Sequence, residues 1–301
     1  MEFDNAAQMK AFMKKEAARL GITVTNAYST YFARLLLERI SKLSYDKLYV
    51  KGSFSLLTHT NTLIRPVTDI DIVSVEAHNY PILTLYQAMY DSNKDKADKE
   101  KDITFELTDI PKQKSTGIYK IKTKAQFDTI IQPIILDFQE SSKTIYIIDK
   151  ELVPPLFEGD KPFYIYTPTL EEHLAEKLCI ALELSKSDVL NTRVKDFYDI
   201  WKLLEMPYDE EKLSKIFASM ICDRGKIDES EMNVNHLDAK FVNRHEVLWY
   251  SLREKLEFLD KKVDFADSVY RTREILEAQI KDVPKYKHLI KSILPTEGSY
   301  Q

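Results

Sequence analysis

The chain has 301 residues, of which 44% are hydrophobic and 30% charged, and its net charge is −5. This length allows one large domain or two medium ones with a buried core. The negative charge argues against a protein that coats nucleic acid, since such proteins are normally basic. No run approaches the roughly 18 apolar residues of a membrane span, and the first fifteen residues lack a signal-peptide pattern, so we expect a cytoplasmic protein without a membrane partner.

The first half of the chain mixes helical and strand patterns. Helical spacing of apolar residues and runs of β-branched residues distinguish the two. Asp4 or Asn5 is the expected cap of the first helix and Gly21 its end. The predicted elements are helices at 5–20 and 25–43, a strand at 47–50, a helical turn at 54–58, a strand at 69–73, a helix at 79–90, and strands at 103–107, 118–121 and 133–138. The mixed charges of residues 91–102 predict an exposed, mobile loop or a frayed helix end.

The pattern changes after Asp149. Prolines and Gly159 mark a connecting segment over residues 154–162, and helical spacing dominates from Thr169 onward. The predicted helices are 170–186, 192–205, 209–221, 244–260, 265–282 and 285–293, with capping-box spacing for Thr169 with Glu172 and for Asn243 with Glu246. We therefore expect an α+β protein with an α/β domain over residues 1–160 and an all-helical domain over residues 161–301.

A glycine-serine turn and an acidic pair stand close together in the first half. Gly52 lets the backbone approach a phosphate and Ser53 adds a hydroxyl and an N–H, although an ordinary strand-to-helix turn has the same sequence. Asp69 and Asp71, two residues apart on a strand, project from one face. Adjacent carboxylates repel unless a cation neutralises them, so the pair predicts a Mg²⁺ or Mn²⁺ site beside a nucleoside triphosphate. The alternative is a pair of strand-end aspartates that face solvent.

Asp137 is a single carboxylate in an otherwise apolar strand. If that strand neighbours the one bearing Asp69 and Asp71, three carboxylates converge. Such a set suits two-metal phosphoryl-type transfer, with one metal on the triphosphate and the other at the attacking hydroxyl. The third carboxylate would then bridge to that hydroxyl or accept its proton.

The helical half carries charges within apolar stripes. Lys177 lies in the apolar stripe of its helix, and Arg193 and Asp196 lie in that of the next, with Asp199 at its flank. Charges in such positions need a partner. Two interpretations stay open: a Lys177–Asp196 pair within the core, or a cleft in which Lys177 and Arg193 neutralise phosphate.

These residues together resemble a known family. Lys51-Gly52-Ser53, then Arg65 and Thr68 before Asp69-Ile70-Asp71, resemble the opening motif of the DNA-polymerase-β-like nucleotidyltransferases. Glu176-Lys177-Leu178 followed by Arg193-Val194-Lys195-Asp196-Phe197-Tyr198-Asp199 is similar more specifically to the AbiEii/AbiGii (MenT-like) toxins of type IV toxin–antitoxin and abortive-infection systems. The resemblance spans residues 45–205.

The resemblance implies a mixed sheet flanked by helices in the N-terminal domain and a role for each matching residue. Lys51, Gly52 and Ser53 would bind the nucleotide with Lys177 and Arg193, Asp69 and Asp71 would bind the metal, and Asp196 or Asp199 would act in the active site. The implied reaction is transfer of NMP from an NTP to RNA, plausibly to the 3′ end of tRNA, which arrests growth and defends against phage. A cognate antitoxin, acting with or without direct contact, is the implied partner. Two alternatives stay open: transfer to a small hydroxylated molecule, as in aminoglycoside nucleotidyltransferases, and a module that binds NTP without turnover.

Overall fold

The computed structural model describes residues 3–42, 48–74, 90, 103–109, 112–113, 117–140, 148–185, 190–224 and 232–293. Nearly all of the helix predicted over residues 79–90, and the charged segment 91–102, lie outside the described residues. By its internal contacts the chain divides into two compact units. The first comprises Met1–Pro168 with Glu257–Leu259, and the second Thr169–Leu256 with Asp260–Gln301.

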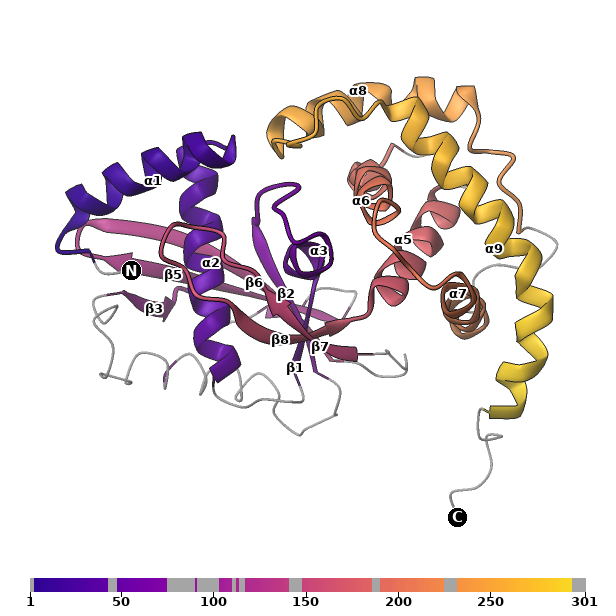
Figure 1. Ribbon diagram of the computed structural model, residues 1–301, viewed down its shortest axis with the longest axis horizontal. Helices are drawn as coiled ribbons and strands as arrows, with labels where there is room; N and C mark the ends of the chain where they lie inside the picture. The colour runs from indigo at the N-terminus through magenta and orange to yellow at the C-terminus, as the bar shows by residue number, and fades with distance from the viewer. Residues whose placement is uncertain are drawn as a thin grey trace, which may run out of the picture. The chain divides into compact units, whose positions relative to one another are not determined.

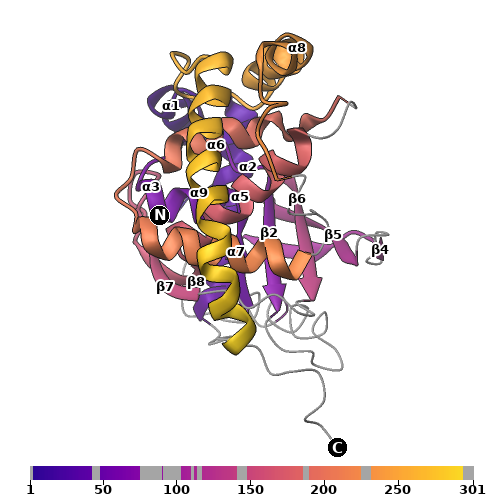
Figure 2. The same ribbon diagram turned by 90° about the vertical axis from the view of Figure 1, so that its right-hand side faces the viewer.

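The first unit is built on a mixed β-sheet with the strand order β1-β2-β6-β5-β3, and β4 also pairs with β5. β2 and β6 are parallel neighbours, whereas the other adjacent strands are antiparallel. Figure 2 shows β2, β6, β5 and β4 following one another across the sheet. The strands are β1 (Leu48–Lys51), β2 (Asp69–Ser74), β3 (Thr104–Leu107), β4 (Lys112–Gln113), β5 (Ile118–Phe127) and β6 (Ile130–Glu140). The mixed sheet confirms the predicted fold class.

Three helices of this unit lie within the described segments: α1 (Ala6–Leu20), α2 (Val24–Lys42) and α3 (Gly52–Thr60). The Asn5 side chain caps α1 by accepting from two backbone N–H groups, and Gly21 ends it at φ +71°, as the sequence predicts. α2 crosses one face of the sheet and α1 packs against α2 (Figure 1). α3 follows β1 directly and begins at Gly52.

The alternation of side chains along β2 and β6 separates the core from the opposite face of the sheet. Ile70, Ile72, Leu136 and Phe138 are each at most 1% exposed and belong to the same hydrophobic core as α1 and α2. Since successive strand residues point to opposite faces, the aspartates between these residues lie on the face away from α2. Burial of the apolar set therefore positions the candidate site.

β5 and β6 are longer than the sequence predicts. They form a ten-pair antiparallel hairpin whose turn contains Asp128 at φ +49°. Lysines interrupt the apolar run of β5, but they occupy alternate positions and so fit one face of a strand.

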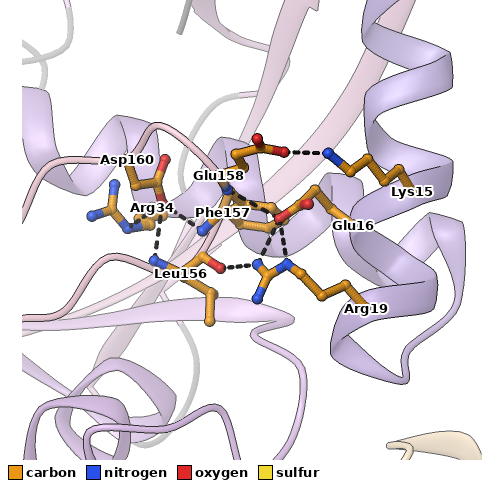
Figure 3. A network of polar contacts seen from close by, with 8 residues as sticks. All are labelled: Lys15, Glu16, Arg19, Arg34, Leu156, Phe157, Glu158 and Asp160. Atoms are coloured by element: carbon orange, nitrogen blue, oxygen red, sulfur yellow. Dashed lines mark hydrogen bonds and ion pairs between the residues drawn. The ribbon is translucent and has the colours of Figure 1, made fainter.

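A two-stranded sheet of β7 (Ile148–Val153) and β8 (Phe163–Pro168) was not predicted, since prolines and Gly159 dominate this stretch. The loop between β7 and β8 is held by the polar network in Figure 3. The buried Arg34 forms an ion pair with Asp160 (3.1 Å) and donates to the Lys161 carbonyl (2.7 Å). The buried Glu16 accepts from Arg19 and from the Glu158 backbone N–H. The network therefore fixes the β7–β8 loop to α1 and α2.

The described residues of the second unit are mainly helical, which agrees with the predicted helical C-terminal part. Its helices are α5 (Leu170–Ser185), the 3₁₀ turn η2 (Thr192–Val194), α6 (Lys195–Leu203), α7 (Glu210–Arg224), α8 (Ala239–Lys255) and α9 (Phe265–Ile293). Among the helices in the described segments, none combines the length and apolar character needed to cross a membrane.

The predicted boundaries of α8 and α9 are wrong, and α8 also ends at Lys255, five residues before the predicted end. α8 begins five residues before the predicted start, because Asp238 accepts from the Phe241 N–H (3.0 Å) and is the true cap, whereas Asn243 lies inside the helix. α9 is continuous through Pro284, where the sequence predicts a break. Proline removes one helical hydrogen bond without necessarily ending the helix. Thr169 does cap α5, accepting from the Glu172 N–H (3.3 Å) as predicted.

Candidate active site

The sequence-predicted site residues form two groups, one in each unit. The first group comprises Lys51, Gly52, Ser53, Asp69, Asp71 and Asp137 in the sheet unit, and the second comprises Lys177, Arg193, Asp196 and Asp199 in the helical unit. The structure brings the members of each group together. That both groups face one cleft stays a prediction.

The three aspartates occupy neighbouring positions on one face of the sheet. β2 and β6 pair in parallel with Asp71 directly beside Asp137, and Asp69 lies two residues from Asp71 along β2. Each of the three side chains is partly exposed, while the residues between them are buried. The condition on which three converging carboxylates depended, a strand with Asp137 next to the strand with Asp69 and Asp71, is therefore met. Their role in metal binding stays a prediction.

Gly52 is required by the position of Asp71. Its φ is +67°, a left-handed conformation that strains other residues. A Cβ at this position would also overlap the Asp71 carboxylate and lie only 3.1 Å from its Cγ. The turn between β1 and α3 thus packs its backbone against the carboxylate. The N-terminal turn of α3, a type of structure that favours anions, lies beside the acidic face.

Two hydrogen bonds orient the polar side chains of this group. The buried Arg65 donates from Nη1 to Ser53 Oγ at 2.7 Å. Ser53 Oγ therefore acts as an acceptor toward Arg65, and its own hydrogen is the one directed elsewhere. Thr68 Oγ1 donates to Asp69 Oδ1 at 3.2 Å. Arg65 thus orients Ser53, and Thr68 orients Asp69.

The same face carries a cation at each side of the carboxylates. Lys51 pairs with Asp71 across β1 and β2, and Lys120 pairs with Asp137 across β5 and β6. A row Lys51–Asp71–Asp137–Lys120 therefore crosses four strands. Lys120 was missed by sequence reasoning, because the strand pairing that places it there is not visible in a local pattern.

The donor chemistry of this group fits Mg²⁺. Among the described residues no three His, Cys, Asp or Glu side chains are arranged as a ready-made metal-binding group. Mg²⁺ does not require one, since it is commonly bound by one or two carboxylates together with substrate phosphates and water. Partly exposed carboxylates at adjacent positions of one face provide that kind of partial ligand set.

The second group is a buried ion cluster. Lys177 Nζ donates to Asp196 Oδ1 and to Asp199 Oδ2, both at 2.8 Å, and Arg193 Nε donates to Asp196 Oδ2 at 2.9 Å. Lys177 joins α5 to α6 through these contacts. The Lys177–Asp196 pair, one of the two interpretations open from the sequence, is thus present.

The electrostatics of this cluster favour ionised Asp196. Burial raises the pKa of the Asp196 carboxyl, but the positive charges of Lys177 and Arg193 outweigh it, so this pKa lies below its ordinary value. The Arg193 side chain is 48% exposed, whereas that of Lys177 is 8% exposed. Of the two cations, Arg193 is therefore the one that solvent or a ligand can reach.

The chain matches one protein family and is similar in fold to solved structures. A family model described as nucleotidyl transferase AbiEii toxin, type IV TA system, matches residues 34–289. The crystal structure of JHP933 from Helicobacter pylori has a TM-score of 0.50 at 15% identity, covering 88% of this chain and 97% of that one. An antigenic nucleotidyltransferase-like protein from Paracoccidioides brasiliensis has a TM-score of 0.40 at 13% identity, covering 85% and 92%. No curated protein matches the sequence.

Proposed function

The chain belongs to the AbiEii family of nucleotidyltransferase toxins of type IV toxin–antitoxin systems, and from this premise we propose that it transfers NMP from an NTP to a hydroxyl of RNA. We assign the 3′ end of tRNA as the acceptor, whose modification would stop translation and arrest growth, including during phage infection. A cognate antitoxin would counteract it. The observation that carries the proposal is the pairing of Asp71 with Asp137 beside Gly52, with Asp69 on the same face.

We propose that the triphosphate binds at the turn between β1 and α3. Gly52 presents backbone without a side chain there, and Ser53, held by Arg65, offers its hydroxyl hydrogen to a phosphate oxygen. Lys51 adds a positive charge on the neighbouring position of β1. Asp69, Asp71 and Asp137 would hold Mg²⁺ or Mn²⁺, and that ion when bound neutralises phosphate charge and acidifies a coordinated hydroxyl.

The transfer step uses the acceptor hydroxyl as nucleophile. Its oxygen forms a bond to the α-phosphorus while the bond from that phosphorus to the bridging oxygen breaks, so pyrophosphate leaves with the electron pair. Asp137 is the residue that we assign to accept the hydroxyl proton, since it lies one strand further from the phosphate turn than Asp71. Asp69 and Asp71 would then serve as metal ligands.

In the helical unit we propose that a positively charged side chain binds the nucleotide phosphates. Arg193 is the more exposed cation and would contact them directly, whereas the buried Lys177 donates to Asp196 and Asp199. The lowered pKa of Asp196 makes it a weak proton acceptor. We therefore assign Asp196 and Asp199 to holding Lys177 and Arg193 in place.

The function is tested by incubating the protein with each of four α-labelled NTPs and total RNA. We expect label to enter an RNA species of tRNA size and to depend on added Mg²⁺ or Mn²⁺. Label in a small hydroxylated molecule instead would identify the aminoglycoside-type activity. Calorimetric binding of NTP with no transfer to any acceptor would identify a non-catalytic module and contradict the proposal.

A further inference from the structure

The face of the sheet that bears the aspartates continues across β6 and β5 as two rows of side chains. In the middle of β5 three alternate residues are lysines: Lys120, Lys122 and Lys124. On β6 the corresponding positions are Ile131, Pro133 and Ile135, followed by Asp137. The antiparallel register places Lys120 opposite Asp137, Lys122 opposite Ile135 and Lys124 opposite Pro133. Directly opposed residues share a face, so a basic row and an apolar row run side by side toward Asp137.

The apolar row is unusual for its exposure. Ile131 is 60% exposed, Pro133 is also exposed and Ile135 is partly exposed. Ile134 and Leu136, which alternate with them and point to the other face, are buried in the core. An isolated exposed apolar side chain is ordinary, but a contiguous set bordered by charges is typical of a binding surface. Here lysines border Pro133 and Ile135, and the polar Gln126 borders Ile131.

The lysines are available for anions. Within the described part of the chain no ion pair involves Lys120. Lys122 pairs with Asp109 at 3.5 Å and Lys124 with Glu106 at 3.0 Å, but in both pairs one side chain is more than half exposed. Such surface pairs contribute little in water, so a phosphate group can replace the carboxylate.

We propose that these two rows bind a single-stranded nucleic acid whose terminal hydroxyl lies at Asp137. Lysines at alternate strand positions are about 6.8 Å apart and offer a regular series of contacts to backbone phosphates, while bases and sugars cover the apolar row. A charged track beside apolar contacts is the usual design of surfaces that hold unpaired strands. This inference rests on the proposed function, because it treats the rows as the acceptor side of the transfer site.

The order of elements across the sheet supports this assignment. The Gly52-Ser53 turn follows β1 at one side of the carboxylates, and the lysine row lies on β5 at the other side. Asp71 and Asp137 stand between them. An NTP at the turn and a strand over β5 and β6 would therefore approach the carboxylates from opposite sides, as nucleophile and leaving group must in an in-line displacement.

The test measures binding of a fluorescein-labelled 12-nucleotide single-stranded RNA by anisotropy, without NTP, over a range of salt. For the triple variant Lys120→Gln/Lys122→Gln/Lys124→Gln we expect Kd to rise at least about tenfold and the salt slope to fall by about 2, since each lost phosphate contact removes about 0.7 for single strands. The control Lys10→Gln/Lys14→Gln/Lys161→Gln removes the same charge from exposed positions elsewhere in the sheet unit and should leave Kd within about twofold.

Two single substitutions probe the rows separately. Ile131→Ser should weaken binding severalfold, whereas Leu152→Ser, an exposed apolar residue on β7, should not. Glu106→Gln should tighten binding, because it releases Lys124 from its carboxylate. A gain of affinity of this kind cannot arise from partial unfolding.

Two results would overturn the inference: equal binding by the lysine-row and control triple variants, or equal competition by duplex and single-stranded RNA. If only the proposed function is wrong, the result differs: the wild-type protein would bind the RNA strand but would transfer no label to it. NTP binding by the lysine-row variant, measured by calorimetry, should remain at the wild-type level.

Discussion

The carboxylate of Asp71 on β2 occupies the space where a side chain on Gly52 would begin. The two residues are nineteen positions apart in sequence, yet their contact joins the phosphate-compatible turn to the acidic face of the sheet. Two features require glycine at position 52: its positive φ and its contact with Asp71. Gly117 has a positive φ without such a contact, so the two effects can be tested separately.

We expect Gly52→Ala to reduce nucleotide transfer by at least about a hundredfold and to cost about 1–2 kcal/mol of stability from the left-handed backbone. Gly117→Ala is the matched control, because Gly117 has a similar φ of +79° but no atom within 4 Å of the point that a Cβ would occupy. It should show a comparable loss of stability by urea denaturation with activity intact. Equal activities for the two variants would mean that the contact with Asp71 is irrelevant to the chemistry.

The buried cluster of the helical unit predicts a loss of stability. Lys177→Met removes the cation that both Asp196 and Asp199 contact, and breaking a buried ion pair costs about 3–5 kcal/mol. Lys215→Met is the control, since its pair with Glu211 is exposed and worth under about 1 kcal/mol. Thermal unfolding of both variants checks this. An unchanged midpoint for Lys177→Met would show that the cluster is not structural.

The pH dependence of stability should report Asp196. Its folded-state pKa is lowered, so the stability that its ionised form contributes is complete above the unfolded value of about 3.9 and is lost as the pH falls through the folded value. The difference in unfolding free energy between wild type and Asp196→Asn should thus be constant from pH 7 to about pH 5. It should shrink below about pH 4. A difference that shrinks near neutral pH would instead assign the effect to another group.

From the contacts in Figure 3 we expect Arg34 of α2 to be the residue that contributes most to holding the β7–β8 loop in place. Arg34→Met leaves the largely buried Asp160 carboxylate without its ion pair and the Lys161 carbonyl without its donor, so we expect a loss of about 2–4 kcal/mol. Lys15→Met, which removes only the exposed contact with Glu158, should cost under about 1 kcal/mol. Equal losses would show that the buried contacts add nothing beyond the exposed one.

Much of this fold follows from periodicity in the sequence. The change from strand to helical spacing near residue 169 and the Asn5 and Gly21 signals gave the class and several helix ends, because these patterns are local. The β7–β8 hairpin was not predicted because prolines and Gly159 in this stretch indicate a loop. The start of α8 was predicted too late because Asn243 has capping-box spacing, whereas the side chain that caps the helix is that of Asp238. Where two local patterns of similar strength predict different boundaries, the sequence alone does not decide which of them the folded protein uses.

Only part of the candidate site could be predicted from the sequence, because the rest depends on pairing between distant strands. Asp69 and Asp71 share a face by strand geometry alone, so they could be predicted. Whether Asp137 joins them depends on pairing between strands about sixty residues apart, and Lys120 enters the row only through one further pairing. Register between distant strands is fixed by burial of the whole sheet face, which no short motif contains.

Everything proposed for this site depends on Asp71 and Asp137, paired across β2 and β6, forming the reaction centre. The most direct measurement is the initial rate of label transfer from α-labelled NTP to RNA by Asp137→Asn, compared with Asp149→Asn on an exposed position of β7. We predict a fall of at least about a hundredfold for Asp137→Asn with unchanged thermal stability, and a wild-type rate for Asp149→Asn. A wild-type rate for Asp137→Asn would contradict the proposed reaction centre.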